Sequence, residues 1–360
     1  MEFQRAVRYP LMAAGMICLL VGMAAGLLRL NLNLFLVSPS LAAVHGPLMV
    51  AGFLGTVIGL ERAVALGRAW GYAAPFFSAV GGIWLVAGGA ERVGAALFLV
   101  SSVFMVAIYA VILRRQGVMF NVVMTLGAAA WGVGNGFWLL QYPVGTFVLW
   151  WGGFVVFTIA GERLELSRFI QPPRFAQSLF GALMGVLLAG MVAAPFNPGP
   201  GSKAFGAAMA ATALWLFVYD IPRRTIRQTG LTRFVAASLL PGYLWMAVSG
   251  LLLVFQSGWP VGPFYDPVLH SLFLGFAFSM IFGHAPIIFP AVLKVEVPYS
   301  PAFYVHLALL HASLLARVFG TLLDAQAAHT VGGALNALAL LVFLANTVVA
   351  VARGLAKPAQ

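Results

Sequence analysis

Residues 270–290 read HSLFLGFAFSMIFGHAPIIFP, and this stretch decides the fold class. Apart from its two histidines it holds no ionisable residue, and a run of about 20 apolar residues is the length of an α-helix that crosses a membrane. The whole chain repeats this composition, since 62% of its 360 residues are hydrophobic and 8% are charged. The sequence therefore predicts an all-α integral membrane protein and excludes a soluble domain.

The net charge of +11 does not indicate a nucleic-acid partner, because the basic residues fall in short clusters between apolar runs. Such clusters are typical of membrane topology signals, and the expected partner is the lipid bilayer. The single cysteine, Cys18, excludes a disulfide framework and a cysteine-based metal site, which leaves histidine as the strong nitrogen ligand. The first residues, MEFQRAVRYP, lead into a long apolar run without a small-residue cleavage site, which predicts a retained first helix.

Apolar segments of membrane-spanning length predict twelve helices in one polytopic domain that covers residues 1–360. The boundaries between them carry Gly, Pro, Asn and Ser, which are typical of turns. The predicted helices cover residues 9–29, 41–66, 72–90, 93–113, 118–140, 144–166, 175–194, 203–221, 232–255, 264–293, 299–322 and 329–352.

The distribution of the 20 Lys and Arg residues predicts the orientation. Sixteen of them lie at the two termini or in loops after even-numbered helices. The other side holds four, namely Arg29, Arg92, Lys203 and Arg317. Because cytoplasmic loops carry the excess of positive charge, both termini are expected in the cytoplasm.

This topology allows the depth of each histidine in the membrane to be estimated. At 1.5 Å of rise per residue, His45 lies roughly 6 Å and His270 about 9 Å below the predicted outer boundary. His284 and His306 are similarly level near the cytoplasmic side. Fourteen residues of helix are nearly whole turns, so His270 and His284 are expected to leave helix ten on one face, about 21 Å apart. His311 lies mid-membrane on the eleventh helix, about 140° around it from His306, and need not face the same site.

Two level pairs of imidazoles suggest axial ligands of haem iron, because bis-histidine ligation needs two helices that present rings at one depth. The expected pairs are His45 with His270 and His284 with His306, so the cofactor would be one or two b-type haems. A copper ion at His284, His306 and His311 is the rival interpretation of the inner pair. Satisfied core histidines remain the alternative for each pair.

Charged and helix-breaking residues add further expectations. Arg29 and Arg317 lie at the outer ends of their helices, where they either pair with haem propionates or only snorkel to the interface. Glu162 is the candidate for a proton relay, with an interfacial anchor as its alternative. Pro286 and Pro290 are expected to break helix ten near its cytoplasmic end, where they mark either an irregular segment that lines a cavity, as in transporters, or only the end of the helix.

Two stretches resemble the NnrS family, twelve-helix bacterial membrane proteins that bind haem and copper and are associated with nitric oxide stress. VHGPLMVAGF (44–53) is similar to that family's WHAHEMLFGF type of signature, with His45, Met49, Gly52 and Phe53 in register. HSLFLGFAFSMI (270–281) is similar to its HALTVGAIGTMI type of segment, with matches at His270, Gly275, Met280 and Ile281.

The resemblance extends more distantly to subunit I of haem–copper oxidases, in which histidines of helices two and ten hold a haem. It implies a multi-pass protein of a bacterial-type inner membrane. Departures are also present: Pro47 replaces the second histidine of the helix-two signature, and helices six and seven contain no histidine. A binuclear centre of the usual oxidase design is therefore not expected.

The sequence thus predicts a membrane haem protein for electron transfer or nitric oxide handling, with a small gas or a redox partner. A haem-dependent oxidoreductase is one form of this function. The alternatives are a cofactor-free secondary transporter for a small solute, gated at helix ten, and an assembly subunit whose histidines only form hydrogen bonds. The sequence does not indicate an oligomeric state.

Overall fold

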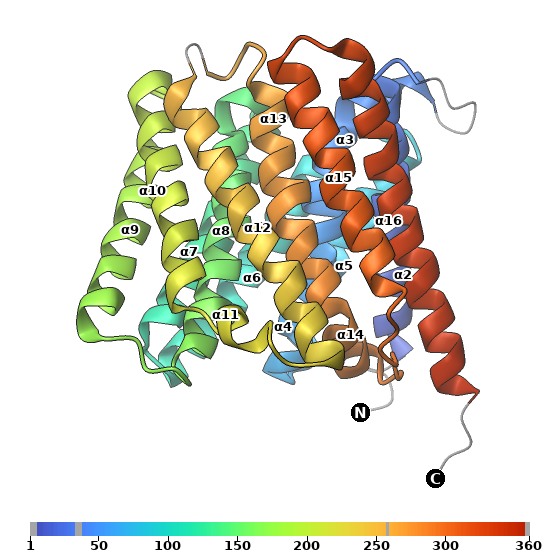
Figure 1. The fold of residues 1–360 in the computed structure, drawn as a ribbon. Helices are drawn as coiled ribbons and strands as arrows, with labels where there is room; N and C mark the ends of the chain where they lie inside the picture. The colour runs from blue at the N-terminus through green and yellow to red at the C-terminus, as the bar shows by residue number, and fades with distance from the viewer. Residues whose placement is uncertain (1–5, 33–37, 257–258, 357–360) are drawn as a thin grey trace. The chain divides into compact units, whose positions relative to one another are not determined.

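The computed structural model describes residues 6–32, 38–256 and 259–356 (Figure 1). Over these ranges the chain is helical and contains no strand. Twelve of the helices in the described part are long and apolar enough to cross a membrane, which confirms the predicted multi-pass, all-α class. Each predicted range overlaps one of them. The side on which the termini lie stays a prediction.

Nine spans are single α-helices. They are α2 (Arg8–Arg29), α6 (Glu91–Arg115), α7 (Met119–Leu139), α8 (Val144–Ser167), α9 (Arg174–Ala193), α10 (Pro198–Tyr219), α12 (Gly230–Phe255), α15 (Phe303–Leu322) and α16 (Gln326–Leu355). A short helix, α11 (Pro222–Thr225), links α10 to α12.

Three spans are composite. The second consists of η1 (Pro39–Val44), α3 (His45–Pro47), η2 (Leu48–Gly55) and α4 (Thr56–Leu66). The third joins η3 (Ala69–Tyr72) to α5 (Ala73–Val86). The tenth consists of α13 (Tyr265–His270), η4 (Ser271–Phe278) and α14 (Ser279–Leu293). The segments η2 and η4 are π-helical, whereas η1 and η3 are 3₁₀-helical.

Contacts between Cα atoms divide the chain into two compact units, Met1–Phe154 and Val155–Gln360. The single domain expected from the sequence stays a prediction. In the first unit, α2 packs against η2 and α5, and α6 packs against α7. Asn135 lies in its core, where its amide nitrogen donates to the Phe98 carbonyl and its oxygen accepts from Trp151 Nε1, each at 3.1 Å. This intramembrane asparagine therefore joins three helices of the unit.

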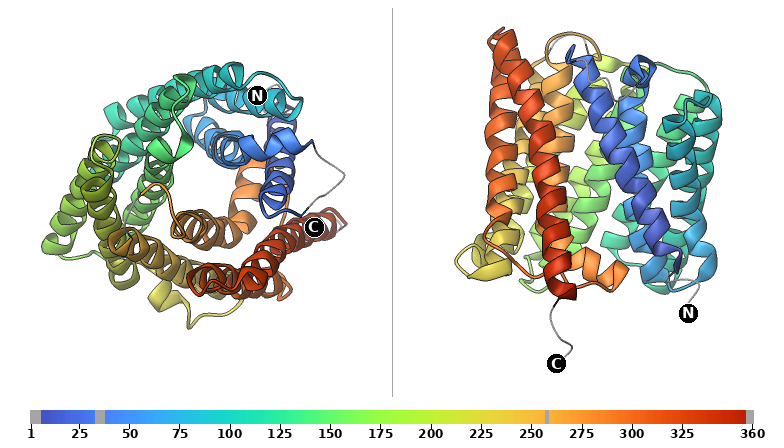
Figure 2. Two further views of the ribbon diagram at one scale, coloured as in Figure 1. Left: turned by 90° about the horizontal axis from the view of Figure 1, so that it is seen from above. Right: turned by 90° about the vertical axis from the view of Figure 1, so that its right-hand side faces the viewer.

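In the second unit, neighbouring helices of the chain form pairs. Figure 2 shows α15 beside α16, and α9 likewise packs against α10. Helix α12 contacts α10, η4 and α14, so it lies between two parts of the unit that are far apart in sequence. The small residues Gly206 and Gly250 permit the α10–α12 contact, because a Cβ on Gly206 would come within 2.6 Å of the Gly250 carbonyl oxygen.

Both π-helical segments end in the same way. In a π-helix each N–H donates to the carbonyl five residues earlier in the chain. Where the segment ends, a carbonyl is therefore left without the N–H that would donate to it in an α-helix, four residues later. The hydroxyl of Thr56 donates to the Gly52 carbonyl oxygen, and that of Ser279 donates to the Gly275 carbonyl oxygen, each at 2.6 Å. The two segments therefore share a Gly-Phe-x-x-Thr/Ser ending in which the hydroxyl donates to the carbonyl of the buried glycine.

Two expectations for the tenth span were wrong. Pro286 and Pro290 do not break it, because both lie inside α14, which continues to Leu293. Neighbouring helices in a membrane protein can satisfy the carbonyls that a proline leaves without a donor. The irregularity lies in η4 instead, and a π-helix takes more residues per turn than an α-helix. The α-helical rotation that placed His270 and His284 on one face therefore does not apply.

Candidate functional site

His45 starts α3 and lies against α2 in the first unit. Its Nδ1 is 2.7 Å from the Gly22 carbonyl oxygen. A carbonyl only accepts, so Nδ1 carries the proton and Nε2 carries the lone pair. A Cβ on Gly26 would lie 2.8 Å from Cε1 of this ring, so glycine at that position makes room for the imidazole. Helix α2 thus fixes both the tautomer and the place of His45.

His270 has the same tautomer in the second unit. Its Nδ1 lies 3.0 Å from the Asp266 carboxylate oxygen Oδ2 and 3.0 Å from the Asp266 main-chain oxygen. Both atoms are acceptors, so Nδ1 donates and Nε2 again carries the lone pair. An imidazole whose second nitrogen donates to a carbonyl or a carboxylate is the usual arrangement of a metal-bound histidine.

Both histidines also lie at the start of a π-helical segment. His270 directly precedes η4, and two residues, Gly46 and Pro47, separate His45 from η2. Single π-helical turns inside longer helices occur frequently at functional sites. The donor chemistry and the local backbone of both residues therefore fit the axial ligand role expected from the sequence.

Asp266 is the centre of a polar cluster that we call the Asp266 cluster, formed by Asp266, His270, Arg317, Thr321 and His329. The Arg317 guanidinium makes two hydrogen bonds to the Asp266 carboxylate, at 2.9 and 2.7 Å. His329 Nδ1 lies 2.7 Å from Thr321 Oγ1 and 3.9 Å from Asp266 Oδ1. The sequence suggested that Arg317 pairs with a haem propionate or snorkels to the interface. In the structure it pairs with the carboxylate of Asp266. Arg29, the other predicted propionate partner, is exposed at the last residue of α2.

His284 belongs to a different network, which we call the Asp220 cluster: Arg163, Asp220, Tyr243 and His284. Arg163 donates to both Asp220 carboxylate oxygens, at 2.7 and 3.0 Å, and the Tyr243 hydroxyl donates to the same carboxylate. His284 Nδ1 donates to the Met280 carbonyl at 2.8 Å, and its Nε2 is 3.3 Å from Arg163 Nη1. A metal on Nε2 would therefore compete with the guanidinium of Arg163.

His306 and His311 have the opposite tautomer. Trp245 Nε1, which can only donate, lies 3.0 Å from His311 Nδ1. Asn346 Nδ2 lies 3.1 Å from both His306 Nδ1 and the Ala302 carbonyl, and this second bond fixes the orientation of the amide. In both histidines the lone pair of Nδ1 is engaged and the proton is on Nε2. The structure thus gives these two rings hydrogen-bonding roles.

The ring of His306 is also surrounded by phenylalanines. The centroids of Phe282, Phe343, Phe303 and Phe234 lie 4.7, 5.4, 5.8 and 6.0 Å from its own. Within the described ranges, no three His, Cys, Asp or Glu side chains form a group that could hold a metal ion. The copper ion at His284, His306 and His311 and the second haem stay predictions.

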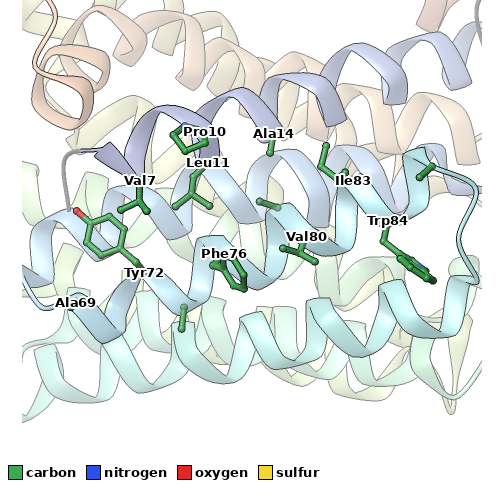
Figure 3. A pocket seen from close by; sticks show the side chains of 13 residues that line it. Val7, Pro10, Leu11, Ala14, Ala69, Tyr72, Phe76, Val80, Ile83 and Trp84 are labelled. Carbon is green, nitrogen blue, oxygen red and sulfur yellow. The ribbon is translucent and has the colours of Figure 1, made fainter. Parts of the chain in front are cut away.

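An apolar groove of about 700 Å³ lies between α2 and α5 in the first unit (Figure 3). Phe76, Val80 and Trp84 of α5 line one side, and Leu11 and Ala14 of α2 line the other. None of its lining residues is a histidine, so the groove is separate from the candidate site.

Sequence reasoning missed three residues that organise the clusters: Asp220, Tyr243 and Asp266. The chain has only three aspartates, and two of them hold an arginine here. The spacing of Asp266 and His270, four residues apart on one helix, is a signal that could have revealed their contact. Nothing in the sequence connects Asp220 to Arg163, which is 57 residues away. Glu162, the predicted relay residue, directly precedes Arg163 and is half-buried.

The fold and the two clusters define a polytopic helical membrane protein with charged networks inside its helix packing. A family model described as "Domain of unknown function (DUF8744)" matches residues 8–352, so the chain belongs to that family. No curated protein and no solved structure matches the chain.

Proposed function

We propose that the protein is a membrane haem protein in which His45 and His270 would hold haem b. The observation that supports this most is the shared tautomer of the two rings. Each Nδ1 donates to an oxygen that can only accept, at 2.7 Å for His45 and 3.0 Å for His270. This hydrogen bond leaves the Nε2 lone pair as the ligand atom that iron requires. The resemblance of both stretches to the NnrS family leads to the same pair.

The other intramembrane histidines provide a contrast. His306 and His311 accept hydrogen bonds at Nδ1, and His284 accepts one from Arg163 at Nε2. A metal ion bound to any of these three rings would replace one of these hydrogen bonds. The proposal is therefore limited to one haem.

Haem would supply a one-electron couple, and the chain would hold it by two imidazoles. Because two imidazoles of the protein would hold the haem, electron transfer is the activity favoured by this ligand set. Nitric oxide would bind only where it displaces one imidazole. The role of Gly22 and Asp266 is to keep each ring in its ligand tautomer.

The test is the visible spectrum and the iron content of the purified protein. The wild type is expected to show a Soret band, the pyridine haemochrome of haem b and one iron per chain. His45→Ala and His270→Ala are each expected to lose this haem. A wild type that contains no haem after expression with an ample haem supply would refute the proposal.

Matched variants at the other histidines make the test specific. His306→Ala and His311→Ala are expected to keep the haem, because their tautomers are those of hydrogen-bond acceptors at Nδ1. If His306→Ala removes haem and His45→Ala does not, the inner histidines are the ligands and the assignment is wrong. Addition of nitric oxide to the reduced protein then measures gas binding: an unchanged Soret band indicates electron transfer alone.

A further inference from the structure

The two proposed ligands differ in the groups around their Nδ1 proton. Each Nδ1 faces a main-chain oxygen, that of Gly22 for His45 and that of Asp266 for His270. His270 Nδ1 also lies 3.0 Å from the Asp266 carboxylate oxygen Oδ2, and Arg317 donates two hydrogen bonds to that carboxylate. The side chains of His270, Arg317 and Asp266 are 18%, 10% and 30% exposed, so solvent reaches the carboxylate only in part. The electrostatic surroundings of the two imidazoles are therefore unequal.

A carboxylate that accepts the Nδ1 proton raises the basicity of a ligating imidazole. The stronger donor favours the ferric over the ferrous state, so the carboxylate lowers the reduction potential of an iron bound at Nε2. Arg317 acts in the opposite sense, because it partly neutralises the carboxylate and competes for its lone pairs. Its two short bonds to Asp266 hold the acceptor oxygen in place.

We propose that Asp266 and Arg317 form a positioning pair that sets the reduction potential of haem ligated by His270, Asp266 lowering it and Arg317 limiting the effect. This inference rests on the proposed haem ligation. It assigns Arg317 to the Asp266 carboxylate and not to a haem propionate. The pair acts through the imidazole and touches neither substrate nor iron.

The remaining members of the cluster keep the pair in place. Thr321 Oγ1 donates to the Arg317 carbonyl oxygen at 3.1 Å and lies 2.7 Å from His329 Nδ1. Because the hydroxyl hydrogen is used by that carbonyl, His329 Nδ1 donates to Thr321. These bonds connect α16 to α15 beside the ion pair.

A purely structural ion pair between α13 and α15 would predict a different outcome. It would affect stability and haem content, but it would not change the electronic state of the iron in variants that keep haem. The ferric low-spin electron paramagnetic resonance spectrum reports the donor strength of the axial ligands. Together with the reduction potential, it separates a tuning role from an anchor.

The experiment is a potentiometric titration of the purified haem protein as wild type, Asp266→Asn and Arg317→Gln. Asp266→Asn is expected to shift the equilibrium toward ferrous iron about tenfold, which is about +59 mV for one electron. Arg317→Gln is expected to shift it in the opposite direction, with a larger spread of the g values. Asp324→Asn is the matched control, because this exposed aspartate follows α15 and its loss removes the same charge. It is expected to leave the potential unchanged.

The outcomes separate this inference from the proposed function. A wild type without haem refutes the proposed function. A wild type with haem and shifts in the same direction, or no shifts, in both variants refutes the inference and leaves haem binding intact. If Asp266→Asn loses its haem, Arg317→Gln decides: a lower potential with altered g values supports the pair, and an unchanged spectrum overturns it.

Discussion

Replacement of Asp220 by Asn is expected to destabilise the second unit strongly. The Asp220 carboxylate is fully buried, and the Arg163 side chain bound to it is 6% exposed. Asn keeps the shape and an oxygen that can accept from Tyr243, but it removes the negative charge. The guanidinium of Arg163 then stays buried without its counter-ion.

The magnitude follows from that uncompensated charge. Removal of one partner of a buried ion pair costs about 3–5 kcal/mol. Exposed substitutions usually change stability by no more than about 0.5 kcal/mol. The gap between these two values is wide enough to be measured by reversible unfolding in mixed detergent micelles, followed by circular dichroism.

Two further variants identify the cause. Asp324→Asn makes the same chemical change at an exposed position and is expected to match the wild type within about 0.5 kcal/mol. The double variant Arg163→Met/Asp220→Leu removes both charges, and it is expected to recover most of the stability lost in Asp220→Asn, because apolar replacements of buried ion pairs are often neutral. If Asp220→Asn is as stable as Asp324→Asn, or if the double variant is less stable than Asp220→Asn, the argument from charge burial fails.

Two other substitutions test the local structure around the candidate ligands. Gly26→Ala is expected to displace the His45 ring, since the new Cβ would lie 2.8 Å from Cε1, and the measurement is the haem content. The control is Gly136→Ala, because its new Cβ would have no atom within 4 Å. Ser279→Ala removes the donor to the Gly275 carbonyl and is expected to cost about 1 kcal/mol of unfolding free energy. An unchanged stability of Ser279→Ala would mean that water or the backbone satisfies that carbonyl.

The number and placement of the spans could be predicted because they depend on composition over about 20 residues. The π-helical segments could not, since an apolar run such as Ser271–Phe278 has the same hydropathy in either helix type. The prediction that His270 and His284 share a face assumed 3.6 residues per turn, and this assumption fails over η4. The glycines at 52 and 275, each followed four residues later by a hydroxyl, are the only trace of the π segments that we find in the sequence.

The candidate site could be predicted only in part, for a different reason. Histidines are rare in membrane spans, so His45 and His270 stand out on chemical grounds alone. Their acceptors do not, because Gly22 contributes a main-chain oxygen and any residue at that position carries one. Asp220 and Tyr243 were missed because their partners lie on other helices: Asp220 accepts from Arg163, and Tyr243 donates to Asp220.

The two ion pairs show how one interaction can serve two purposes in the same unit. Asp220 is withdrawn from solvent, and its four acceptor sites are used by Arg163, Tyr243 and the Ile221 main-chain N–H. Such a carboxylate has no capacity left to respond to a ligand, so it suits a structural connection. Asp266 is 30% exposed and shares its oxygens between a cation and a neutral imidazole. A change at Arg317 or His270 therefore alters the strength of the interaction that Asp266 makes with the other residue. A residue that tunes a bound group requires this property.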